Sequence, residues 1–163
     1  MKAGAGKVDH SALRANQAAI IALLILAFIL DSPPLVTFVA GVMLLGSLIG
    51  RPGFLPVYEA VRALGIARPL LLADNAAPHR FAQTLGGVFL VLSTAGFFAG
   101  LPGLGWLLSW LVVALAALNL FVGFCVGCAV YYWFNRLGLP GFSQAPPAGG
   151  LPGMRPKESA DNG

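Results

Sequence analysis

Charged side chains are scarce in this chain. Asp, Glu, Lys and Arg make up 10% of its 163 residues, whereas 58% are hydrophobic. A soluble domain carries about 25% charged residues, so this sequence has too few polar groups to cover a surface in water. The shortage argues against an ordinary soluble domain and makes the lipid bilayer the natural solvent.

Several familiar sets of catalytic residues are also missing. The six acidic residues are scattered outside the apolar stretches, and the sequence contains no paired carboxylates, no Ser-His-Asp set and no phosphate-binding glycine loop. Two-carboxylate hydrolases, serine hydrolases and phosphate-loop nucleotide enzymes are therefore not indicated.

Four apolar stretches predict the fold. They cover residues 13–30, 35–49, 81–99 and 104–134. A helix needs about 20 apolar residues to cross the hydrocarbon core, so the second stretch is short and the fourth is long. The prediction is an all-α protein, a four-transmembrane-helix bundle made of two helical hairpins within residues 13–136.

Three further segments flank or join the hairpins. Residues 1–12 are expected to form a flexible N-terminal tail, and the Gly/Pro-rich residues 137–163 a mostly disordered C-terminal tail. In the connector between the hairpins, residues 56–64 are amphipathic and predict a short interfacial helix. Asp74 or Asn75 is expected to cap a turn leading into the third span.

Basic residues indicate the orientation in the membrane. All ten Lys and Arg lie outside the two hairpin tips, residues 31–34 and 100–103. The positive-inside rule then places both termini and the connector in the cytoplasm. We expect a multi-pass inner-membrane protein that contacts the lipid bilayer and binds no nucleic acid, because the net charge of +4 is explained by topology and anionic lipid.

The two cysteines, Cys125 and Cys128, lie near the end of the fourth stretch. Positions i and i+3 of a helix share a face, so the sulfurs could act as a redox dithiol, carry sulfur, or only pack between helices. A metal site would need His79 or His10 as further ligands. Neither histidine has ligand spacing to the other, so no metal is predicted.

The depth of the cysteine pair depends on where the fourth span ends. If the span ends near Phe124, Cys125 emerges at the cytoplasmic boundary. If the helix continues to Asn135, the pair lies within the inner leaflet. Gly123 and Gly127 are compatible with both arrangements. A pair facing the cytoplasm would be kept reduced, which favours a transient redox role over a structural disulfide.

Polar residues at the inner ends of the spans form a second candidate feature. Polar groups within a membrane usually face one another or a cavity, so we expect a shared site near the cysteines. In this site His79 and Arg80 would stabilise a thiolate. The other inner-leaflet members are Arg14, Asn16, Gln17, Gln83 and Asn119. The alternative is that the arginines reach lipid phosphates and the amides bond neighbouring helices.

Three segments carry a resemblance to a known family. They are residues 8–17, residues 74–83 and residues 123–128. Together they resemble a bacterial membrane family described as domain of unknown function 4395, over roughly residues 8–142. The resemblance implies a small four-helix membrane protein without a settled activity. Similar proteins occur with rhodanese-like or thioredoxin-like partners, which implies thiol or sulfur chemistry by association.

Two function hypotheses follow. In the first, the cytoplasm-facing Cys-x-x-Cys exchanges electrons or sulfur with a soluble thioredoxin-like or rhodanese-like protein. In the second, the chain is a non-catalytic accessory subunit of a larger membrane complex, packed against partner helices or a bound pigment or haem. The sequence names no substrate or cofactor and leaves open whether the protein is an enzyme.

Overall fold

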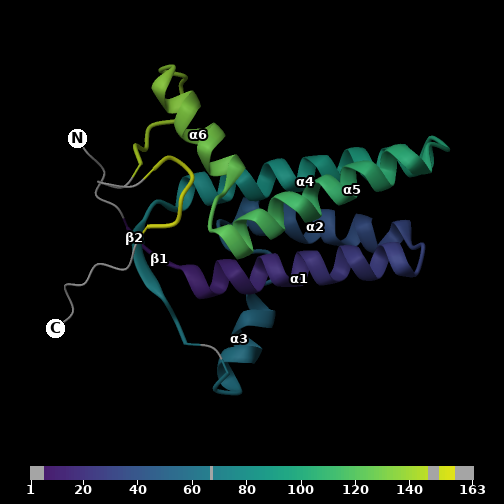
Figure 1. Cartoon of the computed structure of the whole chain (residues 1–163), viewed down its shortest axis with the longest axis horizontal. Coiled ribbons are helices and arrows are strands. Elements are labelled where there is room, and N and C mark those ends of the chain that lie inside the picture. Colours follow the sequence, from purple (N-terminus) through teal and green to yellow (C-terminus); the bar gives the residue numbers. More distant parts are fainter. Residues whose placement is uncertain (1–5, 67, 147–150, 157–163) are drawn as a thin grey trace.

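Four long helices lie side by side and form the body of the molecule (Figure 1). The structure is a computed structural model that describes residues 6–66, 68–146 and 151–156. The four helices are α1 (His10–Ile29), α2 (Pro33–Ile49), α4 (Ala76–Phe98) and α5 (Pro102–Ala117). Most of the described chain is helical, which confirms the predicted helical class.

The helix lengths identify a membrane protein. α1, α4 and the continuous helical segment Pro102–Val122 are each long and apolar enough to cross a bilayer, whereas α2, with 17 residues, is shorter. The outer surfaces of these helices carry large apolar side chains. Leu48, Phe98 and Phe121 are 79%, 88% and 81% exposed. Such side chains are stable when lipid covers them.

Small residues allow the helices of the body to approach one another closely. α4 is central and packs against both α2 and α5. Gly96 lies against the backbone of Gly105, where an added Cβ would stand 3.3 Å from the nearest atom. One turn earlier, the Ser93 hydroxyl donates to the Gly105 carbonyl at 2.7 Å and lies 2.9 Å from the Ser109 hydroxyl. Close packing and interhelical hydrogen bonds of this kind hold helices together in lipid.

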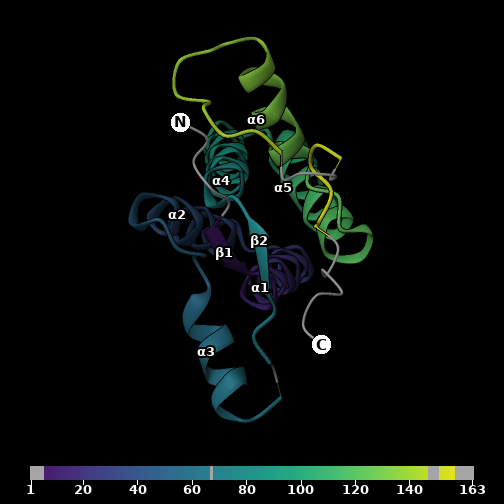
Figure 2. The ribbon, with the colours of Figure 1, turned by 90° about the vertical axis from the view of Figure 1, so that its left-hand side faces the viewer.

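The two ends of the body differ. The turns that join α1 to α2 and α4 to α5 lie at one end (Figure 1). The other end carries a two-stranded sheet, α3 (Leu55–Ala63) and α6 (Val126–Arg136) (Figure 2). Polar and basic segments of the sequence therefore gather at a single end, as the hairpin prediction requires.

The sheet lies where the sequence predicted a flexible tail. β1 (Gly6–Asp9) pairs antiparallel with β2 (Leu71–Asp74), and α1 already begins at His10. Asp9 stabilises this junction, because its Oδ1 accepts from the backbone N–H groups of Ser11 at 3.0 Å and Leu70 at 3.1 Å. Residues 6–12 are thus fixed by a partner more than 60 positions away, which no local pattern reveals. Residues 1–5 lie outside the described part of the chain.

The predicted interfacial helix matches α3 closely. Its buried residue is Tyr58, whose hydroxyl donates to Asp9 Oδ2 at 2.7 Å and so ties α3 to the start of α1. Val57 and Leu64 stay 45% and 74% exposed. Exposed apolar residues beside basic Arg62 suit a helix that lies along a membrane surface.

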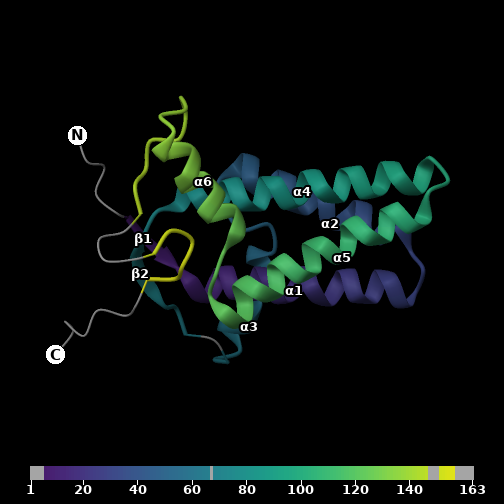
Figure 3. The ribbon, with the colours of Figure 1, turned by 45° about the horizontal axis from the view of Figure 1, so that its top comes forward.

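The fourth apolar stretch is not one helix. α5 passes into a single π-helical turn, η1 (Leu118–Val122), and Gly123 then adopts a left-handed conformation with φ of 75°. The chain turns there, and α6 starts in a new direction and packs against α4 (Figure 3). Glycine tolerates this backbone conformation and other residues resist it, so Gly123 ends the span. The helix therefore ends near Phe124, as in the first of the two predicted arrangements, and does not continue to Asn135 in one direction.

Part of the C-terminal segment contacts the body. The Met154 backbone forms a bridge with Phe124, and the Cys125 N–H donates to the Gly153 carbonyl at 2.8 Å. The Arg155 N–H donates to the Gly123 carbonyl at 2.9 Å. Within the segment that was expected to be mostly disordered, residues 151–156 thus have a defined position over the start of α6. Residues 147–150 and 157–163 lie outside the described part.

Candidate functional site

The two cysteines occupy the N-terminus of α6. Cys125 is the N-cap residue, and its Sγ accepts the backbone N–H of Cys128 at 3.3 Å. Both thiols are free and buried, with exposed fractions of 7% and 3%. Gly127 allows this position, because an added Cβ would stand 2.6 Å from the Ala82 Cβ of α4. The turn at Gly123 and the absent side chain at Gly127 together bring the sulfurs against α4.

A histidine of α4 faces the second thiol. His79 lies in the first turn of α4, and its Nδ1 stands 3.5 Å from Cys128 Sγ. Its Nε2 stands 2.9 Å from Asp74 Oδ2 at the end of β2. An ionised carboxylate can only accept, so the Nε2 nitrogen carries the proton and Nδ1 presents its lone pair to the sulfur. His10 Nε2 lies 3.0 Å from the same carboxylate oxygen, without the alignment of a hydrogen bond.

The surroundings of Asp74, Cys125 and Cys128 shift the pKa values of these three groups by different amounts and for different reasons. Burial alone would raise the pKa of Asp74, but its contacts with His10 and His79 hold that pKa well below its usual range. The pKa of Cys125 is lowered to about 7, first by the hydrogen bond with the Cys128 side chain and further by backbone N–H groups. The pKa of Cys128 is raised by the same hydrogen bond and by burial. The thiolate form is therefore favoured at Cys125 over Cys128, in keeping with its position at a helix N-terminus.

Two cavities meet at Cys125. The smaller, of about 20 Å³, includes Cys125, Cys128 and His79 in its wall. The larger, of about 100 Å³, extends between α1, α4 and α5 past Phe89 and reaches Cys125 at its other end. Drug-sized ligands occupy pockets of about 300–1,000 Å³, so the larger cavity is too small for a haem.

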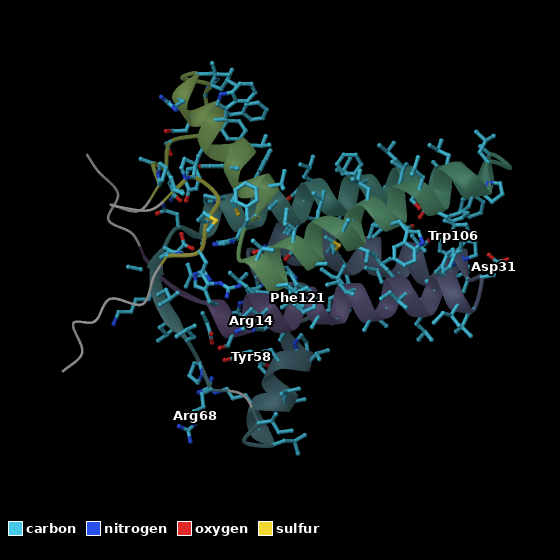
Figure 4. All side chains as sticks on the ribbon, viewed as in Figure 1. Arg14, Asp31, Tyr58, Arg68, Trp106 and Phe121 are labelled. Carbon is cyan, nitrogen blue, oxygen red and sulfur yellow. The ribbon has the colours of Figure 1, made fainter. Side chains whose placement is uncertain are left out.

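Three of the predicted inner-leaflet residues line the small cavity. They are Arg14, Gln17 and Asn119. Figure 4 shows Arg14 at the end of the bundle that carries Tyr58 and Arg68, opposite Asp31. Among the described residues, the buried Oε1 atom of Gln17 has no hydrogen-bond partner.

The other predicted residues are hydrogen-bonded to backbone groups of other segments, although Asn16 and Gln83 also line the larger cavity that reaches Cys125. Asn16 Oδ1 accepts the backbone N–H of Phe54 at 2.9 Å, and Gln83 Nε2 donates to the Met43 carbonyl at 2.9 Å. Arg80 NH2 donates to the Ser47 carbonyl at 3.0 Å, at the C-terminal end of α2. Arg80 also lines a separate cavity beside α3, so its charge is directed to the end of α2 and not to the thiols.

Sequence reasoning missed three residues that the fold brings to the sulfurs. Asp74 was interpreted only as a turn or cap residue, and His10 was considered only as a weak metal ligand. Arg155 lies in the expected tail, yet its NH2 donates to the Asn119 carbonyl at 3.3 Å beside the small cavity. Spacing along the chain could not reveal them, since α1, β2 and residues 151–156 meet α4 and α6 only in the folded structure.

An aromatic cluster lies between α6 and α4. Tyr131 and Phe142 stack edge-to-face with Phe81 of α4, at centroid distances of 5.9 and 5.4 Å. Tyr131 is 4% exposed, so it belongs to the interior and not to a lipid-facing belt. Such edge-to-face pairs contribute roughly 0.5–1.5 kcal/mol each beyond the area they bury, which fixes the distance between α6 and α4.

Comparison with known proteins gives one match. A family model described as domain of unknown function, DUF4395, matches residues 8–136. The matched range contains both histidines, Asp74 and the two cysteines, and it ends before residues 151–156. No curated protein and no solved structure matches the chain.

Proposed function

The chain belongs to the domain of unknown function 4395 family, and we propose that it is a multi-pass membrane protein that performs thiol–disulfide exchange. One observation carries the proposal. Cys125 stands at a helix N-terminus and accepts an N–H, while Cys128, three residues later, faces a histidine that a carboxylate holds in place. Two thiols in unlike environments suit the two successive steps of disulfide exchange.

Cys125 is the attacking thiol. The N-terminus of α6 directs unpaired N–H groups and the positive end of the helix dipole at its sulfur, which favours the thiolate. Arg14 and Arg155 add positive charge to the wall of the same small cavity. The thiolate would attack a disulfide of the partner protein, form a mixed disulfide at Cys125, and release one partner thiolate, which takes up a proton.

Cys128 resolves the mixed disulfide. Its thiol proton passes to His79 Nδ1, which lies 3.5 Å away, and the resulting thiolate attacks the Cys125 sulfur. The second partner sulfur leaves as a thiolate and is protonated. The protein then holds a Cys125–Cys128 disulfide, and the partner's disulfide has become two thiols. The reaction is reversible, so a reduced dithiol partner regenerates the free pair.

A soluble protein with a thioredoxin-like site fits this reaction as the partner. A rhodanese-like partner would instead transfer its persulfide sulfur to Cys125, leaving the partner as a thiol and Cys125 as a persulfide. In both cases residues 151–156 must move, because they lie over the start of α6 and the thiols are at most 7% exposed.

The proposed topology has four crossings of the inner membrane. α2 would cross with the other three helices, since a short span can be accommodated by local thinning of the bilayer. Both termini, α3 and the thiols would face the cytoplasm, because the basic residues gather at that end. Reporter fusions after Arg62 test this orientation, and a reporter that is active outside the cell at that position would contradict it.

Trapping experiments test the chemistry. The reduced full-length protein in detergent is mixed with an oxidised thioredoxin-like protein, and mixed disulfides are resolved on non-reducing gels. Cys128→Ser should accumulate the mixed disulfide, because the resolving thiol is gone. Cys125→Ser should accumulate little. Equal trapping by the two variants, or no exchange by the folded wild-type protein, would exclude the assigned roles.

A further inference from the structure

We infer that the reduced site also binds one Zn²⁺ ion, through His79 Nδ1, Cys125 Sγ and Cys128 Sγ. These three atoms all lie within 4.8 Å of one another, and the three residues line the small cavity. The site needs only free thiols, which the structure has, and it does not depend on the proposed exchange reaction. The sequence pointed away from a metal because the ligands come from elements that are distant along the chain.

The distance between two of the ligand atoms matches zinc geometry. Zn–N and Zn–S bonds of about 2.0–2.1 and 2.3 Å in a tetrahedron place nitrogen and sulfur about 3.6 Å apart. His79 Nδ1 and Cys128 Sγ stand 3.5 Å apart. The ion would therefore enter with little movement of the two side chains. On binding, it displaces the thiol protons of Cys125 and Cys128, and both protons leave to solvent.

The surroundings of His79 favour a ligand role. Histidines that bind zinc almost always donate their other N–H to a carboxylate or carbonyl, which fixes the ring orientation. Asp74 Oδ2 lies 2.9 Å from His79 Nε2 and provides this contact. Because Asp74 holds the proton on Nε2, the lone pair of Nδ1 is already directed at the sulfurs before an ion arrives.

The cavity leaves one position for a fourth ligand. Its volume of about 20 Å³ is enough for one water molecule, since a water needs roughly 10–15 Å³ measured in this way. Three protein ligands and one water are the arrangement of catalytic zinc sites, whereas structural sites use four protein ligands. Two thiolates neutralise the ion, so the buried complex carries no net charge of its own.

A second group of possible ligands competes for the same histidine. His10, Asp74 and His79 also bring their ligand atoms within 4.8 Å of one another. That group would have to use His79 Nε2, which is already engaged with Asp74. Two sulfur ligands also favour zinc more strongly than one carboxylate does. Variants of His10 and of the cysteines distinguish the two groups.

Metal titration of the full-length reduced protein tests the inference. The protein is stripped with a chelator under argon and titrated with Zn²⁺ against a chromophoric competitor, with thiols counted on the same sample. Parallel titration with Co²⁺ reports the ligands, because thiolate–cobalt bonds absorb in the near ultraviolet and tetrahedral cobalt absorbs strongly in the visible. We expect one ion per chain and both absorptions. Cys125→Ser and Cys128→Ser should each lose tight binding.

Two milder variants keep the result interpretable if a cysteine variant misfolds. Asp74→Asn should weaken Zn²⁺ binding by about 10–100-fold, as loss of an orienting partner does, while the cobalt spectrum keeps its thiolate band. His10→Gln should lose less Zn²⁺ affinity than Asp74→Asn does, because His10 contacts Asp74 but supplies no ligand. The inference would be overturned if the wild-type protein failed to bind Zn²⁺. It would also be overturned if His10→Gln lost Zn²⁺ binding while Cys125→Ser retained it. If the protein exchanges disulfides but binds no Zn²⁺, the zinc site is excluded and the proposed function still stands.

Discussion

The helical body and the sheet-bearing end of the molecule are held together in different ways. In the body, apolar side chains such as Leu90 and Val36 are fully enclosed, and small residues let the backbones meet. At the other end, two carboxylates organise the structure, with Asp9 joining β1, α1 and α3 and Asp74 joining two histidines. Apolar packing is non-directional, whereas hydrogen bonds fix atoms in direction and distance, and the candidate site lies where the hydrogen bonds are.

Leu90→Ala should produce the largest loss of stability and leave the rate of the proposed disulfide exchange unchanged. Removing this enclosed side chain from α4 creates a cavity in the body. We expect a loss of about 2–3 kcal/mol, the lower part of the range for buried leucines, because lipid is as apolar as the interior. Thermal unfolding in detergent measures the loss. A changed rate of disulfide exchange in the folded variant would show that the two regions are not independent.

Gly127→Val should affect both the helical body and the sheet-bearing end, because it changes the contact between α6 and α4. Its side chain would collide with the Ala82 Cα and Cβ atoms, which lie 2.7 and 2.6 Å from the position of an added Cβ. Overpacking of this kind costs about 1–3 kcal/mol and should displace α6 from α4, so both thiols become reactive to alkylating reagents. Gly103→Ala, at the hairpin end, is the control, because nothing lies within 4 Å of its added Cβ. Unchanged thiol reactivity in Gly127→Val would contradict the packing.

Asp74→Asn should change the chemistry more than the stability. The amide can still accept a hydrogen bond, so we expect a loss of about 1–2 kcal/mol, near the value for one hydrogen bond to a charged group. His79 would no longer be held in one tautomer, and the resolution step at Cys128 should slow at least about tenfold. The lifetime of the mixed disulfide at Cys125 measures the effect. A lifetime equal to that of the wild type would remove Asp74 and His79 from the mechanism.

Tyr58→Phe should have the smallest effect and reveal a pH dependence. Burial and the contact with Asp9 raise the pKa of Tyr58 above its ordinary value of 10.0. The neutral phenol is thus the stabilising form, so its contribution is complete below pH 10 and is lost as pH rises through the higher folded-state pKa. The variant should lose about 0.5–1.5 kcal/mol at neutral pH and show less alkaline destabilisation than the wild type. Tryptic cleavage at Arg62, followed against pH, monitors the docking of α3.

The contrast between the helical body and the sheet-bearing end also explains how much of the fold the sequence could predict. Residues 33–49 and 76–98 form helices for local reasons, and the apolar stretches located them to within a few residues. The amphipathic pattern also located α3. By contrast, the pairing of residues 6–9 with residues 71–74 joins distant segments, and neither strand has a local signal strong enough to predict it.

The candidate site was predicted only in part, for a related reason. The cysteines and His79 stood out because reactive or polar groups are rare in apolar sequence, and the fold brings them together. Asp74 did not stand out, since an Asp before a helix usually serves as a cap. Arg80 adjoins His79 in sequence, but on a helix consecutive side chains diverge by about 100°, and its guanidinium reaches Ser47 instead.

Residues 151–156 cover the sulfurs, yet they lie beyond the range that the family model matches. The proposed reactive groups therefore lie inside the matched range, whereas the segment that lies over them is outside it. In the proposed reaction, a change of the Met154 side chain would alter which molecules arrive at Cys125 and leave the side chains of Asp74, His79 and the cysteines in place. In the proposed reaction, the choice of partner would thus depend on a short backbone segment that is separate in sequence from the residues that do the chemistry.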